Sequence, residues 1–171
     1  MSKPKPINVE RVRELFEYRD GQLFWKVSRG RGGGAAPAGS RAGWINKDCY
    51  RYVIIDNRAF KEHRVIYALC HGADPAHMQV DHIDGDRANN CIDNLRLATA
   101  AQNKRNLNGL ARRNTSGFRG VHWHKKNNKW CARAKYAGKI IHGGYFTDKQ
   151  EAANRASELR RQYYGEFAGN G

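Results

Sequence analysis

The stretch Val80-Asp81-His82-Ile83-Asp84-Gly85-Asp86-Arg87-Ala88-Asn89-Asn90-Cys91-Ile92-Asp93-Asn94-Leu95-Arg96-Leu97, followed by Thr99-Ala100-Ala101-Gln102-Asn103, decides how the chain is organised. It places a carboxylate beside an imidazole, then a polar loop, and then an amide near a helix start. Such polar side chains make poor core material, because each unpaired buried polar group costs several kcal/mol. They suit a small metal site that acts on phosphate.

The local pattern of this stretch predicts a strand, a loop, a second strand and a helix. Residues 79–83 are expected to form the first strand, Asp84-Gly85 to turn it, and residues 95–97 to return as the second. A capping-box pattern at residues 99–102 starts a helix that holds Asn103 in its first turn or so. This order brings the acid–imidazole pair and the amide within reach of one another, which is the outline of a ββα-metal site.

Hydrolysis of a phosphodiester needs an activated water, neutralisation of phosphate charge and stabilisation of the leaving oxygen. One Mg²⁺, or Mn²⁺, can supply the last two, and it prefers hard oxygen ligands such as Asp81 and Asn103. The near-neutral pKa of histidine makes His82 a candidate general base. Adjacent strand residues point to opposite sides, so this role requires a twist or bulge at His82. Asn94 is better suited to clamp the loop and orient His82.

Three other interpretations of the stretch compete with a metal site of this kind. A calcium EF-hand loop fails, because setting Gly85 as its sixth residue puts Val80 at the first ligand position. Zinc bound through Cys91 and a nearby histidine stays open, although the spacing matches no known zinc motif. A polar turn capped by its own side chains explains residues 84–94. It does not explain Asp81-His82 and Asn103 together.

The bulk composition favours a polyanionic partner. The 171 residues carry 31 Lys and Arg against 16 Asp and Glu, a net charge of +15 with a pI near 10.0. Such an excess attracts nucleic acid. The four cysteines form no C-x-x-C pair, which indicates reduced thiols in a cytosol. No apolar run resembles a signal peptide or a membrane span, so we expect an intracellular protein without membrane contact.

The first part of the chain is predicted to be mixed. A helix is expected over residues 8–18, strand-like segments over 22–27, 50–55 and 59–62, and a helix over 63–71 that ends at Gly72. The Gly-rich residues 28–39 are either a flexible loop or a basic arm, the latter supported by Arg29, Arg31 and Arg41. His63 is expected to be structural, with a phosphate contact as the alternative.

The second part is the more basic per residue. Residues 1–105 have a net charge of +6 and residues 106–171 one of +9. A polar linker is expected over 106–115, then strands over 118–124, 129–136 and 140–146, and a helix from a capping box at Thr147 to about Tyr164, stopped by Gly165. In the middle strand, apolar side chains alternate with Lys129, Cys131, Arg133 and Lys135. One sheet face is therefore expected to pack on the helix, and the other to be basic and able to enter a major groove.

Two resemblances refine this interpretation. Asp81-His-Ile-Asp-Gly-Asp-Arg-Ala-Asn-Asn90 with Asn94-Leu-Arg96 and Asn103 resembles the HNH endonucleases, especially the phage and intron-homing type in its H-N-N variant. The resemblance covers about residues 8–107. It implies a ββα-metal nuclease with His82 as general base, Asp81 and Asn103 as metal ligands, and Asn94 as the structural asparagine.

The second resemblance is carried by Phe118-Arg-Gly-Val121, Lys129-Trp-Cys-Ala-Arg133, Gly144-Tyr-Phe146 and Glu151-Ala-Ala153. These segments are similar to the plant ethylene-response-factor (Apetala-type) DNA-binding domain, over about residues 116–165. The resemblance implies a sheet docked in the major groove. The side chains expected to face DNA are Arg119, His122, His124, Lys129, Arg133 and Lys135. His142 stands where the plant domains carry a tryptophan, so base readout does not transfer.

The sequence therefore predicts an α+β protein of two domains. Residues 1–105 form the HNH nuclease domain, 106–115 a linker, and 116–171 a three-stranded antiparallel sheet with one helix. We expect a metal-dependent endonuclease acting on double-stranded DNA, as a monomer with a dimer left open, in the cytoplasm of a phage-infected bacterial host. The alternatives are a DNA-binding protein that does not cut, with the HNH region as scaffold, and a basic RNA-associated protein.

Overall fold

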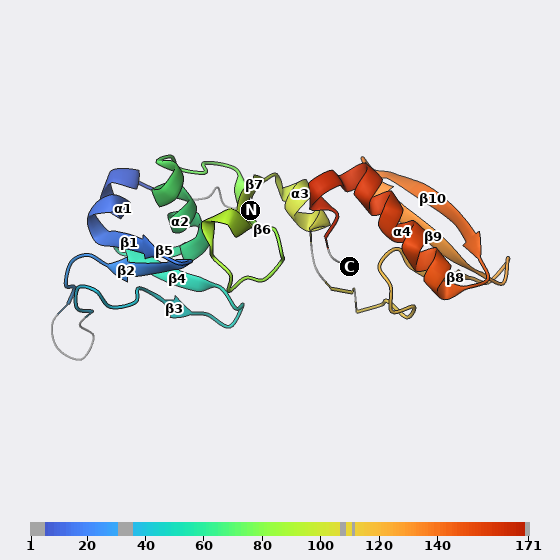
Figure 1. The fold of residues 1–171 in the computed structure, drawn as a ribbon, viewed down its shortest axis with the longest axis horizontal. Coiled ribbons are helices and arrows are strands. Elements are labelled where there is room, and N and C mark those ends of the chain that lie inside the picture. Colours follow the sequence, from blue (N-terminus) through green and yellow to red (C-terminus); the bar gives the residue numbers. More distant parts are fainter. Residues whose placement is uncertain (1–5, 31–35, 107–108, 111, 170–171) are drawn as a thin grey trace. The chain divides into compact units, whose positions relative to one another are not determined.

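The computed structural model describes residues 6–30, 36–106, 109–110 and 112–169. Within these ranges, short helices and small antiparallel sheets follow one another, so the predicted α+β class is confirmed (Figure 1). The chain divides into two compact units, Met1–Ala100 and Ala101–Gly171. The predicted linker at 106–115 stays a prediction, and three of its residues lie outside the described ranges.

The first unit begins with a helix followed directly by a hairpin. Helix α1 (Val9–Leu15) is capped by Asn8, whose side chain accepts a hydrogen bond from the Arg11 amide. The predicted extension to residue 18 is wrong, because Phe16–Arg19 form strand β1, which pairs antiparallel with β2 (Gln22–Trp25). The pairing sets the rings of Phe16 and Trp25 4.5 Å apart between centroids, and this cross-strand contact favours the strand over further helix.

A three-stranded sheet follows, in the order β3-β4-β5. Strands β4 (Arg51–Ile55) and β5 (Arg58–Lys61) form the predicted hairpin, and their two turn residues both have positive φ, as a tight hairpin turn requires. The short β3 (Trp44–Ile45) was not predicted. Within the Gly-rich segment, residues 31–35 lie outside the described ranges, whereas Arg29 and Ala36 pair through a backbone bridge.

Helix α2 (Glu62–His71) lies at the centre of the first unit and ends at Gly72, as predicted, with φ of 69°. Its apolar face packs into a core shared with α1, β2 and β4, formed by Val12, Leu23, Val53, Val65 and Ile66 among others. The two strands of the central stretch come next. β6 (Gln79–His82) pairs antiparallel with β7 (Leu95–Ala98), and α3 (Ala100–Arg105) follows. This is the predicted order of elements.

The second unit is a three-stranded antiparallel sheet with a helix lying along it (Figure 1). The strands are β8 (Val121–His124), β9 (Lys129–Tyr136) and β10 (Lys139–Phe146), in the order β10-β9-β8. Helix α4 (Lys149–Tyr164) is capped by Asp148 rather than by the predicted Thr147, and it stops at Gly165. Ala152, Ala153, Ala156 and Leu159 of α4 are buried.

The register of the sheet defines its outer face, the one turned away from α4. The outward positions are His122, His124, Lys129, Cys131, Arg133, Lys135, Ile140, His142 and Tyr145. Cys131, which lies at the centre of this face, is 1% exposed, so its side chain is covered by its neighbours. The face is therefore not basic throughout. None of the helices in the described ranges is long and apolar enough to cross a membrane.

Candidate active site

The candidate site lies at the end of β6, where Asp81 and His82 follow one another. Both side chains are about 5% exposed. The register sets Asp81 opposite Arg96 and His82 opposite Leu95 on β7. The register is continuous through His82, so the bulge that would turn its side chain toward that of Asp81 is not found in this pair of strands. The two side chains point to opposite sides and contact different groups. Asp81 Oδ2 accepts hydrogen bonds from the Arg96 guanidinium at 3.1 and 3.2 Å.

The loop between β6 and β7 is fastened by Asn94. Its Nδ2 donates to the Asp84 carboxylate and to the Asn89 carbonyl, at 2.9 and 2.8 Å, and its Oδ1 accepts from the Asp84 amide. Burial raises the pKa of Asp84, but hydrogen bonds from Asn94, Asn89 and the Asp86 amide outweigh it and hold that pKa below its usual value. Asn94 thus has the contacts of a loop clamp.

The contact that orients the His82 ring comes from another asparagine. His82 Nε2 lies 2.8 Å from Asn90 Oδ1, and both side chains are buried. The sequence interpretation assigned this orientation to Asn94. It missed Asn90, which looked like one more polar residue of the turn.

His63 packs against the other side of this arrangement. Its ring stands edge-on to that of His82, 4.8 Å between centroids, and Tyr50 lies 5.3 Å from it. Burial, with the positive charges nearby, holds the pKa of His63 well below 6.5. The buried position agrees with the structural role that was expected for it.

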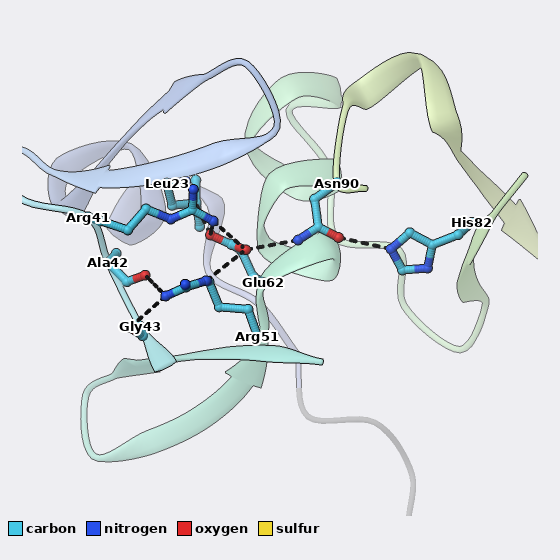
Figure 2. A network of polar contacts seen from close by, with 8 residues as sticks. All are labelled: Leu23, Arg41, Ala42, Gly43, Arg51, Glu62, His82 and Asn90. Carbon is cyan, nitrogen blue, oxygen red and sulfur yellow. Dashed lines mark hydrogen bonds and ion pairs between the residues drawn. The ribbon is translucent and has the colours of Figure 1, made fainter. Parts of the chain in front are cut away.

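Behind Asn90 stands a buried carboxylate that sequence reasoning missed. Glu62, the first residue of α2, is fully buried and accepts hydrogen bonds from Asn90 Nδ2 at 2.8 Å, from the Leu23 amide and from Arg41 (Figure 2). The Arg51 guanidinium lies 3.9 Å from the Glu62 carboxylate and donates to the backbone carbonyls of Ala42 and Gly43.

Arg41 is paired with Glu62 inside the first unit, which contradicts its proposed place on a basic arm. A signal was present, because Glu62 shares a helix face with buried Val65 and Ile66.

Positive charge gathers around Tyr50, next to the two histidines. The Lys61 ammonium lies 3.4 Å from the centre of the Tyr50 ring, and the Arg87 guanidinium 4.8 Å from it. Burial is the main reason that the pKa of Lys61 is lowered, while nearby Asp48 opposes the shift. Contact with the aromatic ring thus holds two cations beside His63 and His82.

The two predicted metal ligands are Asp81 and Asn103. Asp81 supplies a hard oxygen, and an amide oxygen at Asn103, in α3, is of the same kind. Oxygens of these two kinds are ligands that suit Mg²⁺, which keeps several waters and takes only one or two protein carboxylates. Asp81 belongs to the first unit and Asn103 to the second. Among the described residues, no group of three or more histidines, cysteines and carboxylates is gathered as a metal site. The ligand roles of Asp81 and Asn103 stay predictions.

The predicted DNA-facing residues lie in the second unit. Five of them occupy the outer sheet face, and Arg133 and Lys135 are exposed there. Arg119 precedes β8, is partly buried, and donates to the Arg105 carbonyl at 2.7 Å. Burial lowers the pKa of His122, as do the charges of Arg133 and two neighbouring histidines. Trp123 is 41% exposed and stands edge-on to Trp130.

Comparison with known proteins identifies the class. The family model described as HNH endonuclease matches residues 60–105, which run from the end of β5 through α2, β6 and β7 to the end of α3. The chain therefore contains an HNH endonuclease domain over these residues. The match includes Asp81, His82 and Asn103, and it ends before the sheet formed by β8, β9 and β10.

Two of the relatives that the chain matches are proteins of viruses. It is 32% identical to protein 3.8 of Escherichia phage T7 over 111 residues, which are 65% of this chain and 90% of that protein. It is also 32% identical, over 113 residues, to an uncharacterized HNH endonuclease of Acanthamoeba polyphaga mimivirus, covering 62% of this chain and 54% of that one. No solved structure matches the chain significantly.

Proposed function

We propose that the protein is a metal-dependent DNA endonuclease of the homing type that hydrolyses phosphodiester bonds. The observation that carries the proposal is the position of the buried pair Asp81-His82, at the end of β6 and inside the segment that matches the HNH endonuclease family. The name of the mimiviral relative supports the same activity.

In the proposed reaction, His82 takes a proton from a water molecule, and the resulting hydroxide oxygen attacks the phosphorus atom. The bond from phosphorus to the 3′-oxygen breaks, and that oxygen leaves with the bonding electrons and takes up a proton from a second water molecule. A 3′-hydroxyl and a 5′-phosphate result. Asp81 and Asn103 would hold one divalent ion, Mg²⁺ or Mn²⁺. When bound, such an ion neutralises charge on the phosphate and stabilises the leaving oxygen. Asn94 keeps the loop closed over the site.

The cations beside the site support a phosphate substrate. Lys61 and Arg87 are held on Tyr50, whose ring lies 6.2 Å from that of His82. A phosphate approaching His82 would meet these charges and displace counterions, which favours binding to a nucleic-acid backbone.

The second unit is proposed to bring DNA to the site. Its sheet leaves one face uncovered by α4, and its side chains there include Lys129, Arg133 and Lys135. A sheet presented in this way can enter a major groove. The resemblance to the plant ethylene-response-factor domain supports the same use.

The test separates cutting from binding. Supercoiled plasmid and phage DNA are incubated with the full chain in Mg²⁺, Mn²⁺ or EDTA, and DNA binding is followed in parallel by gel retardation. We expect nicked or linear product only with metal, and a loss of about 10²- to 10⁴-fold in His82→Ala with binding retained. His77→Ala, which removes an exposed histidine of the same unit, is the matched control and should cut normally. Cutting by His82→Ala at the full rate would remove His82 from the mechanism.

A second candidate function is a DNA-binding protein that does not cut. The observation that favours it is the ion pair of Asp81 with Arg96, which engages the carboxylate that the metal would need. Retarded DNA complexes on a broad library of sequences, without product in either metal, would support this candidate and reject the nuclease.

A further inference from the structure

Asn90 connects the buried carboxylate of Glu62 to the candidate base His82 (Figure 2). Glu62 Oε1 accepts from the Leu23 amide and Arg41, and Oε2 accepts from Arg41 and from Asn90. With N–H donors at both oxygens, the carboxylate acts only as an acceptor. It therefore fixes the amide of Asn90, because only the NH₂ end can face it.

The orientation of Asn90 determines which nitrogen of His82 carries hydrogen. The Asn90 oxygen, which faces the ring, can only accept, so His82 Nε2 at 2.8 Å must be the donor. In a neutral imidazole the second nitrogen, Nδ1, then lacks hydrogen and is the one that can take a proton.

We propose that Glu62 and Asn90 are positioning residues that set the Nε2–H tautomer of His82, so that Nδ1 accepts the proton of the attacking water. This second part rests on the proposed nuclease function. Glu62 acts through Asn90 and has no direct contact with substrate. We call this chain of three residues the Glu62–Asn90 relay.

The relay makes a specific prediction for Glu62→Gln, a change that keeps the size of the side chain. The Gln oxygen should take the place of Oε1, because the Leu23 amide is part of the backbone and must keep its acceptor. The new NH₂ group then faces Asn90 in place of Oε2. Asn90 responds by turning its amide over, and its own NH₂ group now faces His82. His82 Nε2 must become an acceptor, so the neutral ring switches to the Nδ1–H tautomer.

The experiment reads the tautomer directly. The full chain, labelled with ¹⁵N-histidine, is studied by long-range ¹H–¹⁵N correlation in EDTA, without DNA, at a pH above the histidine titration range. The signals of His82 are assigned by their loss in His82→Ala. We expect the Nε2–H pattern in the wild type and the Nδ1–H pattern in Glu62→Gln. An unchanged tautomer in folded Glu62→Gln overturns the relay.

Two further variants test whether the Glu62–Asn90 relay, and not the loop as a whole, sets the tautomer of His82. Asn89→Ala loosens the same loop, since Asn89 donates to Asp84, but it leaves the relay intact and should keep the Nε2–H pattern. A switch in Asn89→Ala as well would mean that the loop, not the relay, sets the tautomer. Asn90→Leu, of similar volume, should lose the slowly exchanging Nε2–H proton of the wild type. Its retention would overturn the relay even where Glu62→Gln does not fold.

Cleavage is measured separately, so the two proposals can fail separately. The wrong tautomer of a catalytic histidine costs about 10⁴-fold in a serine protease, and we expect Glu62→Gln to cut about 10²- to 10⁴-fold more slowly with its DNA affinity within about twofold. A tautomer switch in a wild type that does not cut would keep the relay and reject the nuclease. Full-rate cutting by Glu62→Gln after a tautomer switch would reject Nδ1 as the accepting atom.

Discussion

His63 is a buried imidazole surrounded by groups that oppose its charge. Burial is the main reason that its pKa is held well below 6.5, and the charges of His82, Lys61 and Arg64 lower it further. In the unfolded chain the same histidine titrates near 6.5. Below that pH the unfolded state binds more protons than the folded state, so the stability that His63 contributes near neutrality is lost as the pH falls.

The expected result is a stability that declines with acidification by up to about 1.4 kcal/mol per pH unit from this group. Urea unfolding of the wild type and of His63→Gln is measured between about pH 7.5 and 5.5, and the slopes are compared. The His63→Gln slope should be flatter, whereas His77→Gln, at an exposed position, should match the wild type. Equal slopes for all three would show that His63 is not the group responsible.

For single residues, the sequence motif predicted some members of the candidate site and not others. Asp81, His82 and Asn94 stand at fixed offsets within one stretch, so sequence alone could select them. Glu62 and Asn90 are 28 residues apart, and only the packing of α2 against the loop joins them. Glu62 was also predicted as the last residue of a strand, whereas it is the first residue of α2. Its position on the apolar face was the only local sign of burial.

Among the elements, the end of α1 at Leu15 shows that hydrophobic periodicity alone does not predict where a helix ends. Val12, Leu15 and Phe16 fit one helical face, and the sequence predicted helix through residue 18. Phe16 instead pairs with Trp25 across the hairpin β1–β2. The choice was made by a cross-strand contact that a window of local sequence does not contain. The three strands and the helix of the second unit were predicted, because turn residues and alternation are local. The first strand begins at Val121 and not at Phe118, so its predicted start was wrong.

Gly21 links this hairpin to the loop of the candidate site. Its φ is +76°, and a Cβ there would lie 2.9 Å from the Cys91 amide nitrogen and 3.2 Å from the Asn90 carbonyl carbon. Gly39 has a similar φ of +81° with open space around it. Gly39→Ala therefore carries the conformational cost alone, about 1–2 kcal/mol. Gly21→Ala adds the steric conflict, about 1–3 kcal/mol more.

The free energies of unfolding of the two variants are compared by urea denaturation. Because the conflict falls on the backbone of Asn90, Gly21→Ala should also weaken the protection of the His82 Nε2–H proton, and Gly39→Ala should not. Equal destabilisation by the two changes would mean that the hairpin and the loop do not support each other as described.

For the whole molecule, the division of charge matters more than its total. The net charge of +15 is spread unequally, and residues 106–171 carry +9 of it. The net charge predicted a polyanionic partner, but it could not show which surface of the protein binds that partner, because it does not depend on where the charges lie. The register of β8, β9 and β10 adds the direction, because it separates the outer face from the face covered by α4.

The role of that outer face can be tested with two variants that change the net charge equally. Arg133→Gln removes a cation from the outer face, and Arg161→Gln removes an exposed one from α4. Each phosphate contact adds about 0.9 to the slope of log affinity against log salt. Affinity for duplex DNA is measured by fluorescence anisotropy over a salt series, in EDTA so that nothing is cut. The slope is negative, and its magnitude should decrease by about 0.9 for Arg133→Gln and stay unchanged for Arg161→Gln. Equal changes in the two variants would show that overall charge, and not the sheet face, holds the DNA.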